Sequence, residues 1–253
     1  MATMSFTRTR KFRERSSQII LLILLAFFAV PFIFPLIWLV STAFKSAAQI
    51  YVSLPIWLPL PLQWQNFPNA WKVAPFGRFL VNSMITTFIP MLGEIFVSAM
   101  VAYSFARVRW PGRDKIFGLC LGVMILPSII TFIPTFVMFS KVGWINTFLP
   151  LVVPSFFGSA FYIFLLRQFM MTLPEGLEEA ARIDGASTFQ IFSKVILPLL
   201  KPALATVAIF SFMSHWTDFF GPMIYLQKGT LKTLMLGLAT FESSMSGAGG
   251  SHI

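Results

Sequence analysis

The 253-residue chain is 57% hydrophobic and only 11% charged, with a mean hydropathy of +0.78. A chain with so few charged residues has too little polar surface to cover a water-soluble globule of this size. The composition therefore excludes an ordinary soluble domain and indicates a membrane protein. The formal net charge of +10 does not indicate nucleic-acid binding, because Lys and Arg form short clusters between apolar runs. Cys120 is the single cysteine, which excludes a disulfide framework and leaves no predicted metal site.

Apolar runs long enough to cross a bilayer recur along the chain. A helix needs roughly 20 mostly apolar residues to span a hydrocarbon core of about 30 Å. The sequence therefore predicts an all-α fold: a basic segment at residues 1–18, then one polytopic transmembrane helix bundle at residues 19–253. The five predicted spans are 19–44, 79–105, 116–139, 148–166 and 202–226.

The basic residues predict how these spans are oriented. If the N-terminus lies inside, the inner segments carry 13 Lys and Arg residues and the outer segments carry six. Lys and Arg in short loops stay preferentially on the cytoplasmic side, so we expect a cytoplasmic N-terminus. The outer segment 46–78 is rich in Pro and Trp, which fits either an ordered interfacial loop or a passive connector. The Gly- and Ser-rich residues 243–253 are typical of a loop or a disordered tail.

The inner loop at residues 171–201 has the pattern of two short helices. Pro174 suits the first position of a helix, and Gly185 suits the left-handed residue just beyond its end. Glu178 and Arg182 have the spacing of an i, i+4 ion pair. The charged face holds Glu175, Glu178, Glu179 and Arg182, and the other face holds Leu177, Ala180 and Ala181.

A second helix is predicted directly after a turn at residues 184–186. Ser187 followed by Gln190 is a capping-box pattern, so the helix should begin at Ser187 and continue until Pro198 interrupts it. The turn would set the two helices at an angle, and the small residues of the first would let another backbone approach closely. A capped helix held below the membrane can transmit the movement of a partner.

These residues resemble a known signature. Glu179-Ala180-Ala181, then Gly185, then residues 195–198 resemble the EAA motif of ABC importer permeases, with Val195 as the only departure. Residues 173–186 as a whole resemble the carbohydrate-uptake branch related to the maltose permease. The likeness extends to Phe105-Ala106-Arg107 with Pro111-Gly112-Arg113, to Leu126-Pro127, and to Trp216 with Asp218.

The resemblance implies a multi-pass subunit of a bacterial or archaeal plasma membrane importer for a sugar or related solute. Its implied partners are a second permease subunit, two ATP-binding subunits and an extracytoplasmic solute-binding protein. ATP and Mg would bind to the partner ATPase, because this chain has no G-x-x-x-x-G-K loop and no catalytic constellation. The family usually has a sixth span after the region that corresponds to residues 231–241, and the sequence up to residue 253 predicts only five. The implied ATPase-docking positions are Glu178, Glu179, Ala180, Ala181, Asp184 and Gly185.

Three ionisable residues fall inside predicted spans, where such groups are costly and merit a functional hypothesis. They are Glu94 in the second span and His215 with Asp218, three residues apart, in the fifth. They could line the solute pathway, relay protons, or pin the bundle through Asn82, Thr86 or Tyr103; pathway lining or pinning is favoured over proton relay. An ion-coupled secondary transporter is the alternative to an ATP-driven importer, and an intramembrane enzyme is a weaker one.

Overall fold

The computed structural model describes the backbone of residues 3–50, 52 and 54–249, and every regular element in these ranges is helical. This confirms the predicted all-α class. Side chains are described at residues 17–50, 52, 54–127 and 129–243, so most basic side chains of the predicted segment 1–18 lie outside them. The chain forms two compact units, Met1–Val73 and Ala74–Ile253, and each is described by itself.

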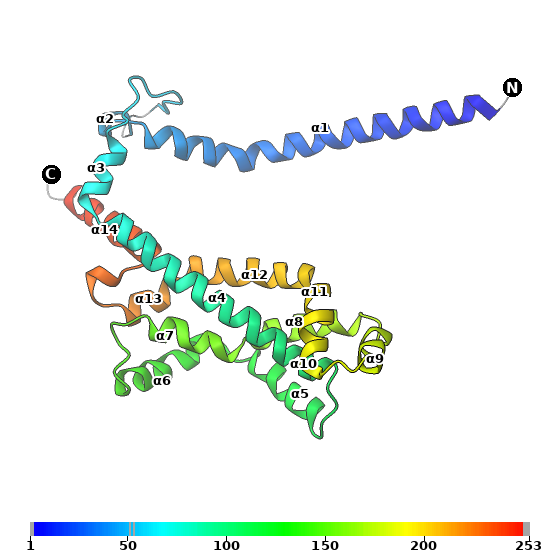
Figure 1. The fold of residues 1–253 in the computed structure, drawn as a ribbon. Coiled ribbons are helices and arrows are strands. Elements are labelled where there is room, and N and C mark those ends of the chain that lie inside the picture. Colours follow the sequence, from blue (N-terminus) through cyan, green and yellow to red (C-terminus); the bar gives the residue numbers. More distant parts are fainter. Residues whose placement is uncertain (1–2, 51, 53, 250–253) are drawn as a thin grey trace. The chain divides into compact units, whose positions relative to one another are not determined.

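The first unit contains one long helix and two short ones: α1 (Thr3–Ala43), α2 (Ala47–Ile50) and α3 (Asn66–Val73) (Figure 1). The apolar part of α1, Ser17–Ala43, is long enough to cross a membrane and confirms the first predicted span. Pro31 and Pro35 lie inside α1 without ending it. Its large apolar side chains are exposed, as expected of a helix whose solvent is lipid.

The segment after α1 is folded onto the end of this helix. The Trp57 ring packs at 5.0 Å from Phe34 and 5.1 Å from Trp38, measured between ring centroids. The ammonium of Lys45 lies 3.6 Å from the centre of the Trp38 ring, and the Ser41 hydroxyl donates to the carbonyl of Trp57 at 2.7 Å. These contacts favour the ordered loop over the passive connector.

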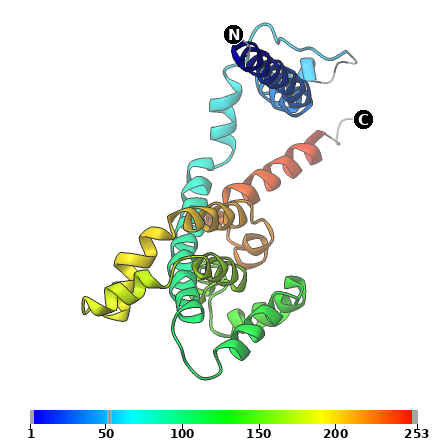
Figure 2. The ribbon, with the colours of Figure 1, turned by 90° about the vertical axis from the view of Figure 1, so that its right-hand side faces the viewer.

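The second unit is built around α4 (Phe76–Ala106), its longest helix. In Figures 1 and 2, α8 and α12 lie against α4, with α9 to α11 near its C-terminal end and α14 near its start. The other elements, in chain order, are α5 (Arg113–Val123), α6 (Ser128–Lys141), α7 (Leu149–Val152), the 3₁₀-helix η1 (Val153–Phe157), α8 (Ala160–Met171), α9 (Gly176–Ile183), α10 (Thr188–Gln190), the π-helix η2 (Ile191–Ile196), α11 (Leu197–Leu199), α12 (Lys201–Trp216), α13 (Phe220–Tyr225), the 3₁₀-helix η3 (Gly229–Leu231) and α14 (Leu234–Gly249).

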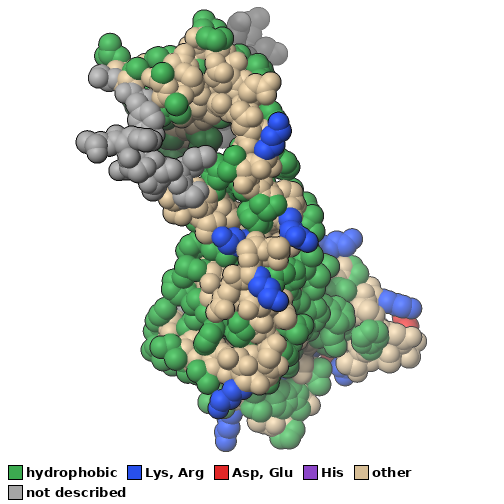
Figure 3. Space-filling view, turned by 90° about the vertical axis from the view of Figure 1, so that its left-hand side faces the viewer, with side chains coloured by type: hydrophobic (Ala, Val, Ile, Leu, Met, Phe, Trp, Pro, Cys, Tyr) green, Lys and Arg blue, Asp and Glu red, His purple; other side chains and the backbone are tan. Residues whose placement is uncertain are grey.

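Small residues allow the helices of this unit to pack closely. Ala99 and Ala102 of α4 are fully buried, and so is Leu166 of α8. Because lipid is as apolar as the side chains, membrane helices associate through close packing, which small residues permit. Figure 3 shows hydrophobic side chains in broad patches on one face, with Lys and Arg scattered between them, as expected of a protein embedded in lipid.

The described residues form fewer long continuous apolar helices than the five predicted spans. Within the described residues, three helices are long and apolar enough to cross a membrane: Ser17–Ala43, Phe76–Ala106 and Leu149–Met171. They confirm the first, second and fourth predicted spans. The third is broken at residues 124–127 into α5 and α6, and the fifth is broken at residues 217–219 into α12 and α13.

The break at residues 124–127 has a local cause. Pro127 has no N–H and disfavours a helical conformation at Leu126, and it precedes α6 in an extended conformation. Composition alone therefore predicts a continuous span where the fold contains two shorter helices.

The tail prediction is also wrong, because α14 continues to Gly249; residues 250–253 lie outside the described part. The start of α14 is fixed to α4, since the backbone N–H of Leu234 donates to the Ser83 hydroxyl at 2.7 Å. The amide of Asn82 donates to the carbonyls of Thr230 and Lys232 at 3.0 and 2.9 Å. Asn82 therefore holds η3 in place, and among the described residues its side-chain amide bonds to backbone carbonyls and not to an ionisable group.

Candidate coupling helix and polar residues of the bundle

The two predicted helices of the 171–201 loop are present. Gly185 follows α9 with φ +81°, a left-handed conformation that glycine adopts without strain. Ser187 and Gln190 form the complete capping box: the Ser187 N–H donates to Oε1 of Gln190 at 2.8 Å, and the Gln190 N–H donates to Oγ of Ser187 at 3.3 Å.

The helix boundaries differ slightly from the prediction. Helix α9 begins at Gly176, so Pro174 lies two residues before it. The second helix continues past Pro198 as far as Leu199, and the chain then bends by 77° into α12. Pro198 is accommodated because it lies at the start of α11, after the π-helical turn η2, where its missing N–H is tolerated.

The outward face of α9 carries the residues of the EAA signature. Glu179, Ala180, Asp184 and Gly185 are exposed, and Ala181 is half-buried. Ile183 is 86% exposed. An exposed isoleucine beside small residues and carboxylates is a surface on which a partner can exclude water.

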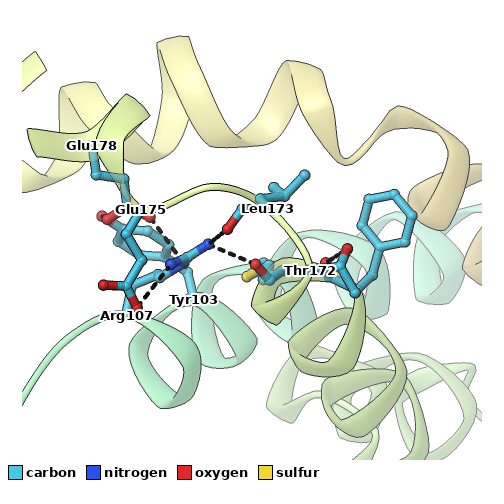
Figure 4. Close-up of polar contacts among 8 residues, drawn as sticks. Tyr103, Arg107, Thr172, Leu173, Glu175 and Glu178 are labelled. Carbon is cyan, nitrogen blue, oxygen red and sulfur yellow. Dashed lines mark hydrogen bonds and ion pairs between the residues drawn. The ribbon is translucent and has the colours of Figure 1, made fainter. Parts of the chain in front are cut away.

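Glu178 lies on the opposite side of α9 and is only 6% exposed. Its Oε1 atom is 3.1 Å from Nε of Arg107, and its Oε2 atom accepts from the Tyr103 hydroxyl at 3.4 Å (Figure 4). The predicted ion pair with Arg182 is therefore replaced by contacts with α4. Glu178 faces the protein interior. The other implied docking residues lie on the exposed face of α9 or, as for Ala181, at the edge of that face.

Arg107 joins three helices at this point. It is the residue directly after α4, and its side chain is 7% exposed. Its Nη2 atom donates to the carbonyls of Met170 and Leu173 at 2.7 and 2.6 Å, so it satisfies carbonyls at the end of α8 (Figure 4). Its Nη1 atom is 3.6 Å from Glu175.

The contact between Arg107 and Glu178 is an ion pair that lacks good hydrogen-bond geometry: Nε and Oε1 are 3.1 Å apart, but neither has an aligned partner in the described residues. The charges therefore hold the two side chains together more than hydrogen bonding does. The sequence resemblance includes Arg107 but gives no role for it.

Glu94 connects α4 to α12. Its Oε2 atom accepts from the Ser211 hydroxyl at 2.6 Å and lies 3.2 Å from Nε2 of His215. Ser211 is fully buried, and sequence reasoning missed it because a serine in an apolar run has no distinctive pattern. The geometry favours the pinning interpretation for Glu94, with Ser211 and His215 as its partners.

Asp218 lies after the end of α12, in the break that leads to α13, and not on a continuous helix face as predicted. Its Oδ1 atom accepts from the backbone N–H of Gly221 at 3.1 Å. Asp218 and His215 both line a cavity of about 220 Å³ with Thr86, Phe132, Leu151 and Tyr225, among others. The structure thus brings two of the three predicted polar residues to one cavity, and Glu94 joins them through His215. Across the described residues, no three His, Cys, Asp or Glu side chains cluster as a metal site would require.

A bundle of long apolar helices with an amphipathic helix between them is the architecture of a polytopic membrane protein. Comparison with known families makes the assignment specific. Residues 94–246 match the model of the binding-protein-dependent transport system inner membrane component. The chain belongs to this family.

Individual relatives of the chain are also named as transport permease proteins. The chain is 33% identical over 222 residues to the diacetylchitobiose uptake system permease protein of Streptomyces coelicolor, covering 87% of this chain and 73% of that protein. It is 33% identical over 222 residues to the sn-glycerol-3-phosphate transport system permease protein of Yersinia enterocolitica, covering 85% and 78%. A crystal structure of a bacterial ABC transporter involved in the import of the acidic polysaccharide alginate matches with TM-score 0.78 and 25% identity, covering 93% and 85%.

Proposed function

We propose that this chain is the membrane subunit of an ATP-driven importer for a sugar or a related hydroxylated solute, and that α9 couples it to an ATPase. The observation that carries the proposal is the outward face of α9, where Ile183 is 86% exposed on a helix whose opposite face is fixed by Arg107. A helix that is rigidly attached on one side and open on the other can pass a partner's movement into the bundle.

The docking surface on α9 consists of Glu179, Ala180, Ala181, Asp184 and Gly185, together with Ile183. The alanines and glycine allow close approach of a partner's backbone, and the carboxylates at the edge favour one orientation over others. Glu178 contributes indirectly, because its buried carboxylate fixes the orientation of α9.

The complete importer contains a second permease subunit, two ATP-binding subunits and an extracytoplasmic solute-binding protein. ATP and Mg bind to the ATP-binding subunits, and this chain carries no catalytic role. The family description supports the dependence on a binding protein. The relatives named as permease proteins for diacetylchitobiose uptake and for sn-glycerol-3-phosphate transport support the solute class. The excess of basic residues in the inner segments supports a cytoplasmic N-terminus in a bacterial or archaeal plasma membrane.

The polar residues of the bundle have two roles in this proposal. Glu94 pins α4 to α12 through Ser211 and His215, as the distances indicate. His215 and Asp218 face the cavity and line part of the solute pathway.

The test replaces Ile183 by Asp, with Ile183→Val as the matched control at the same site. The complex is reconstituted in proteoliposomes with its ATPase and binding protein. Ile183→Asp should abolish both solute uptake and uptake-linked ATP hydrolysis while the protein remains in the membrane, and Ile183→Val should retain both. Uptake that survives Ile183→Asp or removal of the ATPase, and collapses with the proton gradient, would favour the ion-coupled transporter.

A further inference from the structure

A basic pocket lies in the loop that joins α4 to α5 and in the first turn of α5. It is open, has a volume of about 410 Å³, and is lined by Arg109, Trp110, Gly112, Arg113, Asp114 and Lys115. Three of these residues are cations and one is a carboxylate, which gives the lining a net charge of +2. A surface with this excess of positive charge attracts anions.

The carboxylate of the pocket is already compensated by arginines. Oδ1 of Asp114 lies 3.1 Å from Nε of Arg113 and 4.0 Å from Nη2 of Arg167, which belongs to α8. Arg109 and Lys115 are exposed, and neither has an ion-pair partner among the described side chains. Their two positive charges are therefore available to a ligand.

Buried aromatic contacts hold this loop in one place. The Phe105 ring lies 5.7 Å from Trp110 and 5.4 Å from Phe117, measured between ring centroids, and Phe117 is 8% exposed. The guanidinium of Arg167 lies 4.1 Å from the centre of the Phe117 ring, and its Nε donates to the carbonyl of Phe105 at 3.2 Å. Because these contacts fix the walls of the pocket, a ligand would lose little affinity to ordering the loop.

The pocket adjoins the apolar surface on which lipid tails pack. Its loop begins where α4 ends, and α4 is long and apolar enough to cross a membrane, so the pocket falls at the membrane interface, where Trp, Lys and Arg are favoured. In α5, Ile116, Leu119 and Val123 are 49%, 72% and 60% exposed and are spaced as one apolar stripe. Lys115 and Leu119 are four positions apart, which places them on the same side of α5.

This combination of charge and apolar surface favours a phospholipid over a soluble anion. A phosphate ion in water would use the cations but would leave the apolar stripe without a partner. A phospholipid has a phosphate group directly above its acyl chains, which matches a cation placed beside such a stripe. An anionic headgroup fits better than a zwitterionic one, because the second carries a cation that the pocket repels.

We propose that residues 109–115 and the exposed stripe of α5 bind an anionic phospholipid, with Arg109 and Lys115 contacting the phosphate and Ile116, Leu119 and Val123 contacting the acyl chains. In the orientation proposed above, this lipid belongs to the cytoplasmic leaflet. The inference goes beyond the proposed function, since the lipid is neither the solute nor a subunit of the importer.

The test places the purified transport complex in phosphatidylcholine nanodiscs with increasing fractions of phosphatidylglycerol that carries a photoactivatable group in its acyl chain. Mass spectrometry quantifies cross-linking within residues 109–123. Labelling should saturate, and phosphatidylcholine with the same photoactivatable group should label this segment much less. Inorganic phosphate in the buffer should not displace the phosphatidylglycerol probe.

Arg109→Gln/Lys115→Gln removes the two unpaired cations and keeps the buried contacts of the loop. The lipid fraction needed for half-saturation should rise about 25-fold, as expected for two cations near an anionic surface. The matched control is Lys194→Gln/Lys201→Gln, which removes two exposed cations from the 171–201 loop and should leave labelling of residues 109–123 unchanged.

Three results would overturn the inference: equal half-saturation in the native protein and Arg109→Gln/Lys115→Gln, equal labelling by the two lipid probes, or displacement of the lipid by inorganic phosphate. No labelling of residues 109–123 in the assembled complex would also overturn it, because another subunit would then cover the loop. Ile183→Asp, which tests coupling, should retain native labelling, so the two proposals can fail separately.

Discussion

Replacing Arg107 by alanine tests whether α9 is held to the bundle by one buried side chain. The change removes the two hydrogen bonds to the Met170 and Leu173 carbonyls, at 2.7 and 2.6 Å, and the 3.1 Å contact with Glu178. Glu178, at 6% exposure, would lose the cation that lies 3.1 Å from its carboxylate.

The expected cost is large because both members of the pair are buried. Removing one partner of a buried ion pair typically costs about 3–5 kcal/mol, most of it from the charge left behind. Since about 1.4 kcal/mol corresponds to a factor of ten, α9 should open roughly a hundred to several thousand times more often. Helix α9 should then detach from α4, which exposes the Glu178 carboxylate to water.

Hydrogen exchange of the α9 amides in the membrane-embedded complex measures this opening directly. In Arg107→Ala, protection at Gly176–Ile183 should fall while the middle of α4 stays protected, and uptake-linked ATP hydrolysis should fall with it. The double variant Arg107→Met/Glu178→Leu removes both charges and should recover part of the protection, but not all, because the two carbonyls remain unbonded. Equal protection of α9 in the native protein and in Arg107→Ala would refute the reasoning.

Two further substitutions test the turn after α9 and the contact between α4 and α12. Gly185→Ala places a side chain at φ +81°, which should cost about 1–2 kcal/mol and appear as faster exchange at the end of α9, whereas Gly185→Asn should cost less. Glu94→Ala leaves the buried Ser211 hydroxyl without its acceptor and should lower the free energy of unfolding by about 1–3 kcal/mol in thermal denaturation. Glu94→Gln retains an acceptor and should be milder; equal stability of Glu94→Ala and the native protein would contradict the pinning role.

The 171–201 loop could be predicted from sequence because its signals are local. The capping box at Ser187 and Gln190 and the left-handed turn at Gly185 depend on residues within four positions of one another. The lipid environment was equally predictable, since it follows from composition and from runs of apolar residues.

Contacts between distant segments could not be predicted in this way. Arg107 and Glu178 are 71 positions apart, so the spacing of Glu178 and Arg182 favoured a local pair that the fold replaces with a buried one. Ser211 is the partner of Glu94 only because α4 and α12 pack together.

The sequence by itself determined the helical class, the membrane environment and the capped helix of the 171–201 loop, because short-range geometry and apolar length decide them. Only the tertiary structure decided that the last apolar run breaks after Trp216, and which polar side chains meet. A buried charge is stable only beside its partner, and the partners Arg107 and Glu178 lie far apart in the chain.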